Sequence, residues 1–111
     1  MAIQKNITDS FGATHTTSYT RITRIVIYEN RIEVGVGIYH NAAARSKGDS
    51  AAMKIMLSED TELITGSDFD TYFADSVLDN NGISPLKQAY AWLKTQNGFM
   101  DQNWTTGTTD V

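Results

Sequence analysis

The two histidines, His15 and His40, are the side chains best suited by type to acid–base chemistry or metal binding. His15 lies in a threonine-rich stretch, and His40 follows a segment with the pattern of a strand. The chain has no cysteine, so a zinc site would need carboxylates beside the histidines, and no His-x-x-His or His-Glu-x-x-His spacing occurs. We therefore expect both histidines to be solvated or hydrogen-bonded surface residues. We predict no catalytic residue, no metal site and no cofactor.

A group of aspartates is the second candidate for a site, and it consists of Asp68, Asp70, Asp75 and Asp79. The order Asp68-x-Asp70 is similar to the start of a calcium-binding loop, but the glycine and the distal glutamate of such a loop are missing. Aspartates near the start of a helix are stabilised by capping and by the helix dipole. We interpret this group as helix-start residues rather than as calcium ligands.

Composition argues against nucleic acid and against a membrane as partners. The 9 basic residues are outnumbered by 13 acidic ones and are scattered, whereas duplex binding requires clustered Lys and Arg. No apolar run approaches the roughly 20 residues of a membrane-spanning helix, and residues 1–5 lack the features of a signal peptide. A length of 111 residues predicts one domain with a modest core. We expect a protein that stays in the cytoplasm or is assembled into something there.

Residues 21–39 predict a β-hairpin. The first half, residues 21–28, is dense in β-branched side chains, and Glu29-Asn30 has the composition of a turn. In the second half, residues 32–39, polar or small residues alternate with four apolar side chains that share one face: Ile32, Val34, Val36 and Ile38.

Two glycines, Gly35 and Gly37, fall on the opposite face of that second strand. Paired glycines in a strand indicate a bulge, a sharp bend, or the close approach of a backbone or a ring. We favour strong curvature of the sheet, and the alternative is contact with an aromatic side chain of this domain or of a partner. Gly35, Gly37 and the neighbouring Tyr39 are therefore interface candidates.

The stretch from Ser84 to Asp101 predicts a helix with its own start and end. Ser84 can cap the first turn and Pro85 suits the first helical position, while Gly98 can end the helix in a left-handed conformation with Phe99 folded back on Leu93. Four side chains at helical spacing form the face that we expect to pack on the sheet: Leu86, Ala89, Tyr90 and Leu93. Trp92 lies about 110° from the centre of that face, so we expect it to be half exposed and an interface candidate, and the alternative is a second contact with the core.

The remaining segments carry weaker patterns. Residues 1–20 predict an edge strand or an N-terminal arm, residues 41–48 one helical turn or a wide loop, and residues 53–57 a strand. Residues 59–62 have the composition of an acidic turn, and residues 63–65 that of a brief strand. Residues 67–79 have helical spacing, although whether the segment 67–82 is helical stays open. Residues 102–111 predict a flexible tail, in which Trp104 is a further exposed interface candidate.

The Ser84–Asp101 stretch resembles the end of small virion structural proteins of tailed bacteriophages and prophages. In those proteins a Pro-(Leu/Ile)-x-Gln-Ala-Tyr-x-x-(Leu)-Lys helix precedes a Phe and a short acidic end; here the helix reads Pro85-Leu86-Lys87-Gln88-Ala89-Tyr90, then Leu93-Lys94-Thr95. The order of segments is also similar, from the Met-Ala-Ile-x-Lys start through the strand ending in Tyr39 to an Ala-Ala-Arg-Ser-Lys-Gly turn. The chain departs from the pattern between residues 63 and 83 and in its longer tail.

Together these patterns predict an α+β fold, a small antiparallel β-sheet or sandwich with the C-terminal helix packed on one face. Residues 1–101 would form one domain, with an arm over residues 1–20 and a tail over residues 102–111. The resemblance implies a non-enzymatic virion component of the tail, baseplate or fibre-attachment region. Its partners would be other virion proteins and copies of itself in a homo-oligomer. The alternatives are a capsid decoration protein and a small phage-encoded cytoplasmic regulator or inhibitor, and an enzyme is the interpretation we favour least.

Overall fold

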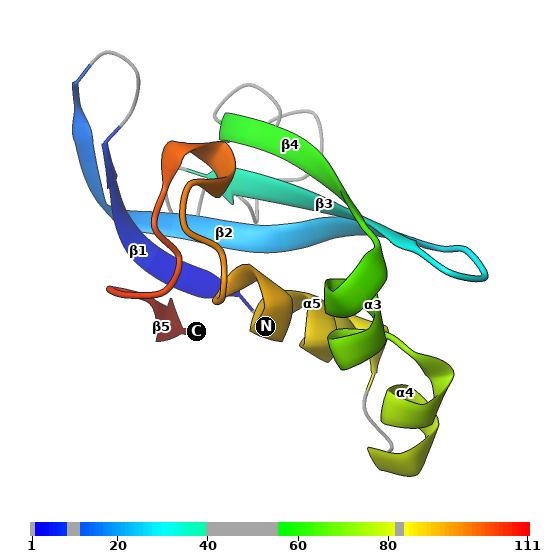
Figure 1. The fold of residues 1–111 in the computed structure, drawn as a ribbon. Helices are drawn as coiled ribbons and strands as arrows, with labels where there is room; N and C mark the ends of the chain where they lie inside the picture. Colours follow the sequence, from blue (N-terminus) through cyan, green and yellow to red (C-terminus); the bar gives the residue numbers. More distant parts are fainter. Residues whose placement is uncertain (1, 9–11, 40–55, 82–83) are drawn as a thin grey trace.

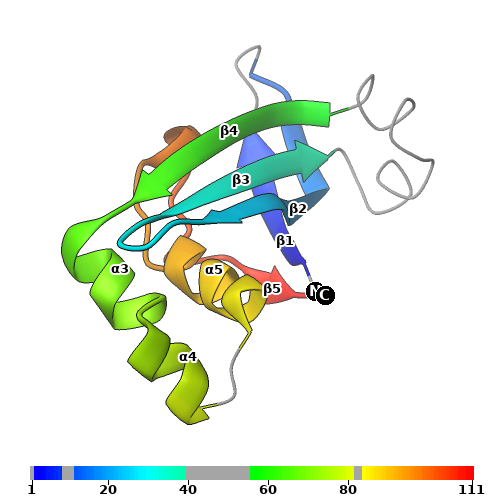
Figure 2. The same cartoon turned by 90° about the vertical axis from the view of Figure 1, so that its right-hand side faces the viewer.

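A computed structural model describes residues 2–8, 12–39, 56–81 and 84–111. Within these residues the strands form one five-stranded antiparallel sheet in the order β4-β3-β2-β1-β5 (Figure 1). The strand bounds are β1 Ile3–Thr8, β2 Thr14–Ile27, β3 Ile32–Tyr39, β4 Met56–Ile64 and β5 Thr109–Asp110. The described helices are α3 Gly66–Tyr72, α4 Asp75–Asn81, α5 Pro85–Leu93 and the 3-10 turn η1 Phe99–Asp101. Helices α3 and α5 lie on one side of the sheet (Figure 2), so the predicted α+β class is confirmed.

The β2–β3 hairpin forms where the sequence predicts it. The Tyr28 N–H donates to the Arg31 carbonyl at 2.9 Å, and Ile27 pairs with Ile32, so Glu29-Asn30 is the turn. The pairing shifts between Ile22 and Arg24, which leaves one extra residue in β2 at this point. A second irregularity in the pairing of β1 with β2 lies between residues 5 and 7 of β1. Such bulges bend a strand and increase its twist, and β2 is visibly curved (Figure 1).

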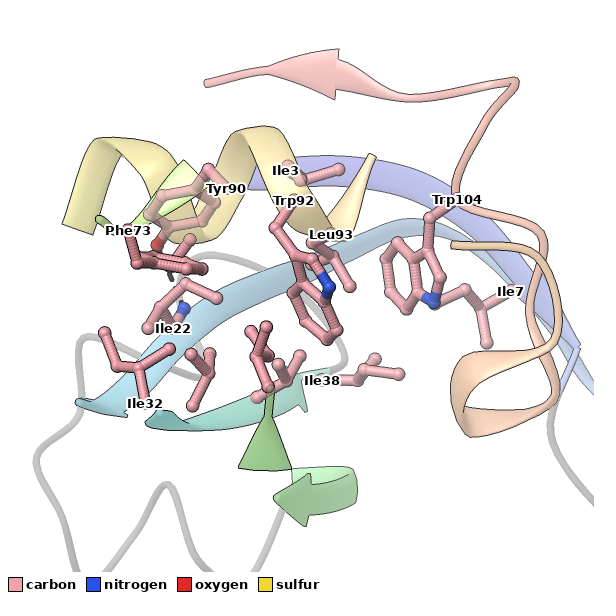
Figure 3. Close-up of a cluster of buried hydrophobic side chains, with 14 residues drawn as sticks. Ile3, Ile7, Ile22, Ile32, Ile38, Phe73, Tyr90, Trp92, Leu93 and Trp104 are labelled. Carbon is pink, nitrogen blue, oxygen red and sulfur yellow. Dashed lines mark hydrogen bonds between the residues drawn. The ribbon is translucent and has the colours of Figure 1, made fainter. Parts of the chain in front are cut away.

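Helix α5 packs its buried side chains against the sheet. Four of its residues are buried: Ala89, Tyr90, Trp92 and Leu93. Figure 3 shows Tyr90, Trp92 and Leu93 pointing toward isoleucines of the sheet. The Tyr90 hydroxyl accepts a hydrogen bond from the Ile22 N–H at 3.0 Å, next to the bulge in β2. The helix therefore supplies both apolar contacts and a partner for a backbone group at the bulge.

The start of α5 is as predicted, but its end and its buried face differ. The Ser84 side chain accepts a hydrogen bond from the Lys87 N–H at 3.2 Å, and Pro85 begins the helix. The helix ends at Leu93, because the Thr95 hydroxyl donates to the Trp92 carbonyl at 2.6 Å and the backbone tightens there. Gly98 has a φ of 108°, but it precedes η1 instead of ending α5.

The predicted packing face is therefore wrong at two positions. Leu86 is 41% exposed, whereas Trp92 is only 2% exposed. The Trp92 ring meets the Phe99 ring edge-on with their centroids 5.6 Å apart, because the chain after α5 returns beside the helix. This second contact, rather than the sheet alone, buries a tryptophan that helical spacing places to one side.

The described part of the N-terminal segment belongs to the sheet. Of the two alternatives predicted for residues 1–20, the strand is present, although it is paired on both sides, and the arm is wrong. Ile3 is fully buried and Ile7 is 4% exposed. Strand β1 pairs with β2 on one side and with β5 on the other. Two aliphatic side chains are sufficient here, because β2, β3, α5 and Trp104 supply the rest of the apolar core to which they belong.

The C-terminal segment is also fixed, so the predicted flexible tail over residues 102–111 is wrong. Trp104 is fully buried, and its indole N–H donates to the Phe99 carbonyl at 2.8 Å. Ala2 and Val111 exchange two backbone hydrogen bonds, of 3.1 and 3.0 Å. The two ends of the described chain consequently lie side by side (Figure 2).

Two assignments in the middle of the chain also change. Residues 59–62, predicted as an acidic turn, lie within β4. The helical pattern of residues 67–79 forms two helices, α3 and α4, instead of one. They separate at Phe73, which leaves the helical conformation (φ −126°, ψ −2°) and buries its side chain in the core. The predicted turn at 41–48, the start of the strand at 53–57 and His40 lie outside the described residues.

Candidate interaction surface

The outer face of the sheet, opposite α5, contains the predicted candidates Gly35, Gly37 and Tyr39. A Cβ atom on Gly35 would lie 3.0 Å from the Thr23 hydroxyl oxygen, and one on Gly37 would lie 3.0 Å from the Thr23 methyl group. Both glycines therefore make room for the bulged residue of β2. The predicted alternative, a nearby ring, is also present, since Tyr39 atoms lie 3.4 Å from the same Gly37 position.

These three candidates pack within the chain. Gly35 and Gly37 are buried, and Tyr39 is 4% exposed. The exposed side chains of this part of the outer face are instead those of Thr23 and Arg24. Arg24 pairs with Glu33 of the next strand at 3.4 Å. The glycines thus act through the shape of the sheet, and they present no side chain to a partner.

The two tryptophans do not provide a surface either. Trp92 and Trp104 are 2% and 0% exposed, so the prediction that they are exposed anchors is wrong. Both belong to the buried cluster between α5 and the sheet (Figure 3). Any contact with another protein would therefore use a different part of the molecule.

Strand β4 is the most accessible long element of the sheet. Among the described residues it pairs with β3 and with no other strand. Five consecutive residues of β4 are exposed: Glu59, Asp60, Thr61, Glu62 and Leu63. A strand at the edge of a sheet presents unpaired backbone N–H and C=O groups, which can pair with another chain. Sequence patterns miss this edge because its composition is that of a turn.

The elements that follow β4 share its charge. From residue 55 to residue 86 the chain has no Lys or Arg and seven acidic residues: Glu59, Asp60, Glu62, Asp68, Asp70, Asp75 and Asp79. All seven are exposed, on β4, α3 and α4. Because the whole chain carries a formal charge of only −4, the remaining residues are on balance basic. The side of the molecule formed by these three elements is accordingly acidic.

A shallow depression lies on each side of β4. The outer one, of about 480 Å³, is lined by Tyr28, Arg31, Glu33, Thr61 and Leu63. The Arg31 guanidinium lies 4.4 Å from the centre of the Tyr28 ring. The second depression, of about 170 Å³, lies on the helix side and is lined by Glu62, Leu63, Ile64, Thr65, Asp68, Trp92 and Gln96. Leu63, which is 50% exposed, borders both.

The residues singled out for chemistry lie apart from one another. His15 is half-buried on β2, in register with Ile7 of β1, while the candidate calcium residues Asp68 and Asp70 lie on α3. No group of three or more His, Cys, Asp or Glu side chains that could hold a metal ion is found in the described part of the chain. None of the helices in that part is both long and apolar enough to cross a bilayer.

Comparisons with protein-family models, with curated proteins and with solved structures found no match.

Proposed function

We propose that this protein is a non-enzymatic structural component of a tailed-bacteriophage virion, located in the tail, baseplate or fibre-attachment region. It would act through contacts with other virion proteins and with copies of itself. Its place in the cell would be the virion, assembled in the host cytoplasm.

The observation that best supports a contact-making role is the open edge of β4. It is nine residues long, and five of these residues, Glu59 to Leu63, are exposed. Natural proteins usually shorten or cover such an edge, because it can pair with other chains. An edge of this length suits a protein whose task is to bind others.

The residues that carry the resemblance to virion proteins support the same proposal in a different way. The Gln88 side-chain amide donates to the Tyr72 carbonyl of α3 at 3.0 Å, and the Tyr90 hydroxyl accepts from β2. These side chains hold the helix layer together and fix it to the sheet. A motif used in this way is expected in proteins that share an architecture rather than a reaction.

Quantitative mass spectrometry of purified phage particles tests the proposal. Particles are separated into heads and tails after disruption, and the copies of this chain per particle are measured in each fraction. We expect a constant copy number in the tail fraction. Host proteins in the same gradient fractions give the background that the chain must exceed.

Two outcomes would contradict the assignment. Recovery in the head fraction would indicate a capsid decoration protein. Presence in infected cells together with absence from particles would indicate a cytoplasmic regulator.

A further inference from the structure

The edge of β4 has a definite pattern of backbone groups. The Thr61 N–H donates to the Asp60 carboxylate at 2.8 Å, so it points away from β3. In an antiparallel strand the backbone groups of alternate residues point the same way. Glu59 and Leu63 therefore also direct their N–H and C=O groups outward. The outward groups of three alternate residues are available to an added strand once the Asp60 carboxylate turns aside.

The side chains of β4 divide between the two faces of the sheet. Glu62 pairs with Val34 and Asp60 with Val36, so these carboxylates lie on the helix side, beyond the covered core. Glu59, Thr61 and Leu63 lie on the outer side, where Leu63 borders the depression that contains Tyr28 and Arg31. A strand added to this edge would meet the two carboxylates of Asp60 and Glu62 on one face. On the other face it would meet Leu63 and Thr61, with the Glu59 carboxylate at the far end.

We propose that the β4 edge binds an extended segment of a partner protein, which adds to the sheet as a further strand beside β4. Alternate Lys or Arg side chains of that segment face Asp60 and Glu62. The side chains between them are apolar, and one lies against Leu63 and the Tyr28 ring. Backbone hydrogen bonds supply the affinity in this type of recognition, and the alternating side chains supply the specificity.

A second copy of the chain fits this edge poorly. Antiparallel pairing of β4 with its own copy would place acidic side chains opposite acidic ones, which is destabilising. The other edge strand of the described sheet, β5, has only two residues. Charge complementarity therefore points to a basic segment of a different protein.

This inference rests on the proposed function only in that the protein acts through contacts with other proteins. The test uses the purified full chain and the blocked heptapeptide Thr-Lys-Val-Lys-Val-Lys-Thr. Titration is followed by the backbone amide chemical shifts of the ¹⁵N-labelled protein. We expect the shifts to concentrate on residues 59–64 and the amides of Thr61 and Leu63 to exchange more slowly in the complex.

Two control peptides separate strand addition from attraction between charges. One has the same sequence with N-methyl groups on both valines, which removes the N–H groups that would face β4. We expect it to bind at least tenfold more weakly, a loss of about 1.4 kcal/mol. The other has Glu in place of each Lys, and we expect no shifts with it.

Matched variants of the protein test the side chains. The double variant Asp60→Asn with Glu62→Gln should bind the lysine peptide roughly threefold to tenfold more weakly than the parent protein, as expected for the loss of two exposed ion pairs. The control, Asp75→Asn with Asp79→Asn, makes the same change in net charge on α4. It should leave the affinity within about twofold.

Several results would overturn the inference. They are absence of binding, equal binding of the N-methylated peptide, shifts centred on α3 and α4, or self-association of the protein through β4. Particle composition is measured separately, so the two proposals can fail independently. If the protein is found in tails but does not bind the peptide, only the strand addition is refuted. A chain that binds the peptide but is absent from particles refutes only the virion assignment.

Discussion

Replacing Tyr90 by phenylalanine measures how much the buried Tyr90 hydroxyl contributes to the attachment of α5 to the sheet. The Tyr90 side chain is 1% exposed, and its hydroxyl accepts from the Ile22 N–H at 3.0 Å. In Tyr90→Phe this N–H stays buried beside the bulge and loses that acceptor. Leaving a buried donor without its partner costs about 1–3 kcal/mol, whereas the change in apolar area is small. We therefore expect the free energy of unfolding to fall by about 1–3 kcal/mol.

Urea denaturation gives this free energy, provided that the slope with urea concentration is the same for both proteins. The matched control is Tyr28→Phe. Tyr28 is 39% exposed, and a phenylalanine ring can still stack under Arg31. This change should stay within about 0.5 kcal/mol of the parent protein. Hydrogen exchange provides a local reading, because the Ile22 amide should exchange faster in Tyr90→Phe.

The reasoning would be refuted if both tyrosine variants lost the same small amount, below about 0.5 kcal/mol, and if the Ile22 amide exchanged at its original rate. That result would mean that the hydroxyl contributes nothing to the attachment of the helix. The apolar contacts of the ring and its neighbours would then account for the whole of it.

Three further changes test other parts of the fold. Gly37→Ala should lower the free energy of unfolding by about 1–3 kcal/mol, as overpacking does. Adding Thr23→Ser should restore part of this loss, because serine lacks the methyl group that the new Cβ would meet. If Gly37→Ala costs the same with Thr23 and with Ser at this position, that contact is not the cause. In a denaturation series, Leu93→Ala should lower the free energy of unfolding by about 2–5 kcal/mol, whereas Leu86→Ala should lower it by less than about 1 kcal/mol. The opposite order would mean that the buried face of α5 is assigned wrongly. Deleting residues 103–111 should cost at least about 3 kcal/mol, because it removes the buried Trp104; unchanged stability and exchange would show that the segment is a tail after all.

Sequence patterns predict the parts of this fold that are stabilised by neighbours close in the chain. The β2–β3 hairpin has a period-two pattern on both sides of a two-residue turn, and both strands are present. The start of α5 depends on Ser84 and Pro85, whose effects are local, and it is also present. In both cases the residues that decide the structure lie within a few positions of one another.

The parts that were predicted wrongly depend on distant neighbours. Ile3 has few apolar residues near it in sequence, but it pairs with Thr20 and Asp110 in the sheet. Trp104 lies among threonines and asparagines, yet its indole donates to Phe99 and it joins the core. No local pattern could show either contact.

The candidate surface was missed for a related reason. Glu59 lies on the outer face of β4, and Asp60 and Glu62 lie on the helix side. All three are exposed, so neither face of this part of the strand is apolar. The usual sign of a strand is alternation between apolar and polar residues, and this edge strand lacks it. The pairing of β4 with β3 is what shows that the acidic segment is extended.

The pairing of the two ends of the described chain also determines how this protein would respond to mechanical force. Ala2 and Val111 are hydrogen-bonded to each other, and the antiparallel contact continues from Ile3 to Asp110 and from Gln4 to Thr109. The hydrogen bonds between antiparallel strands are perpendicular to the strands. A pull that separates the two ends would therefore load these bonds one after another, as in a zipper, and would peel β5 away before it strained β2 or β3. An attachment that joined both ends to the same rigid body would remove this weak point.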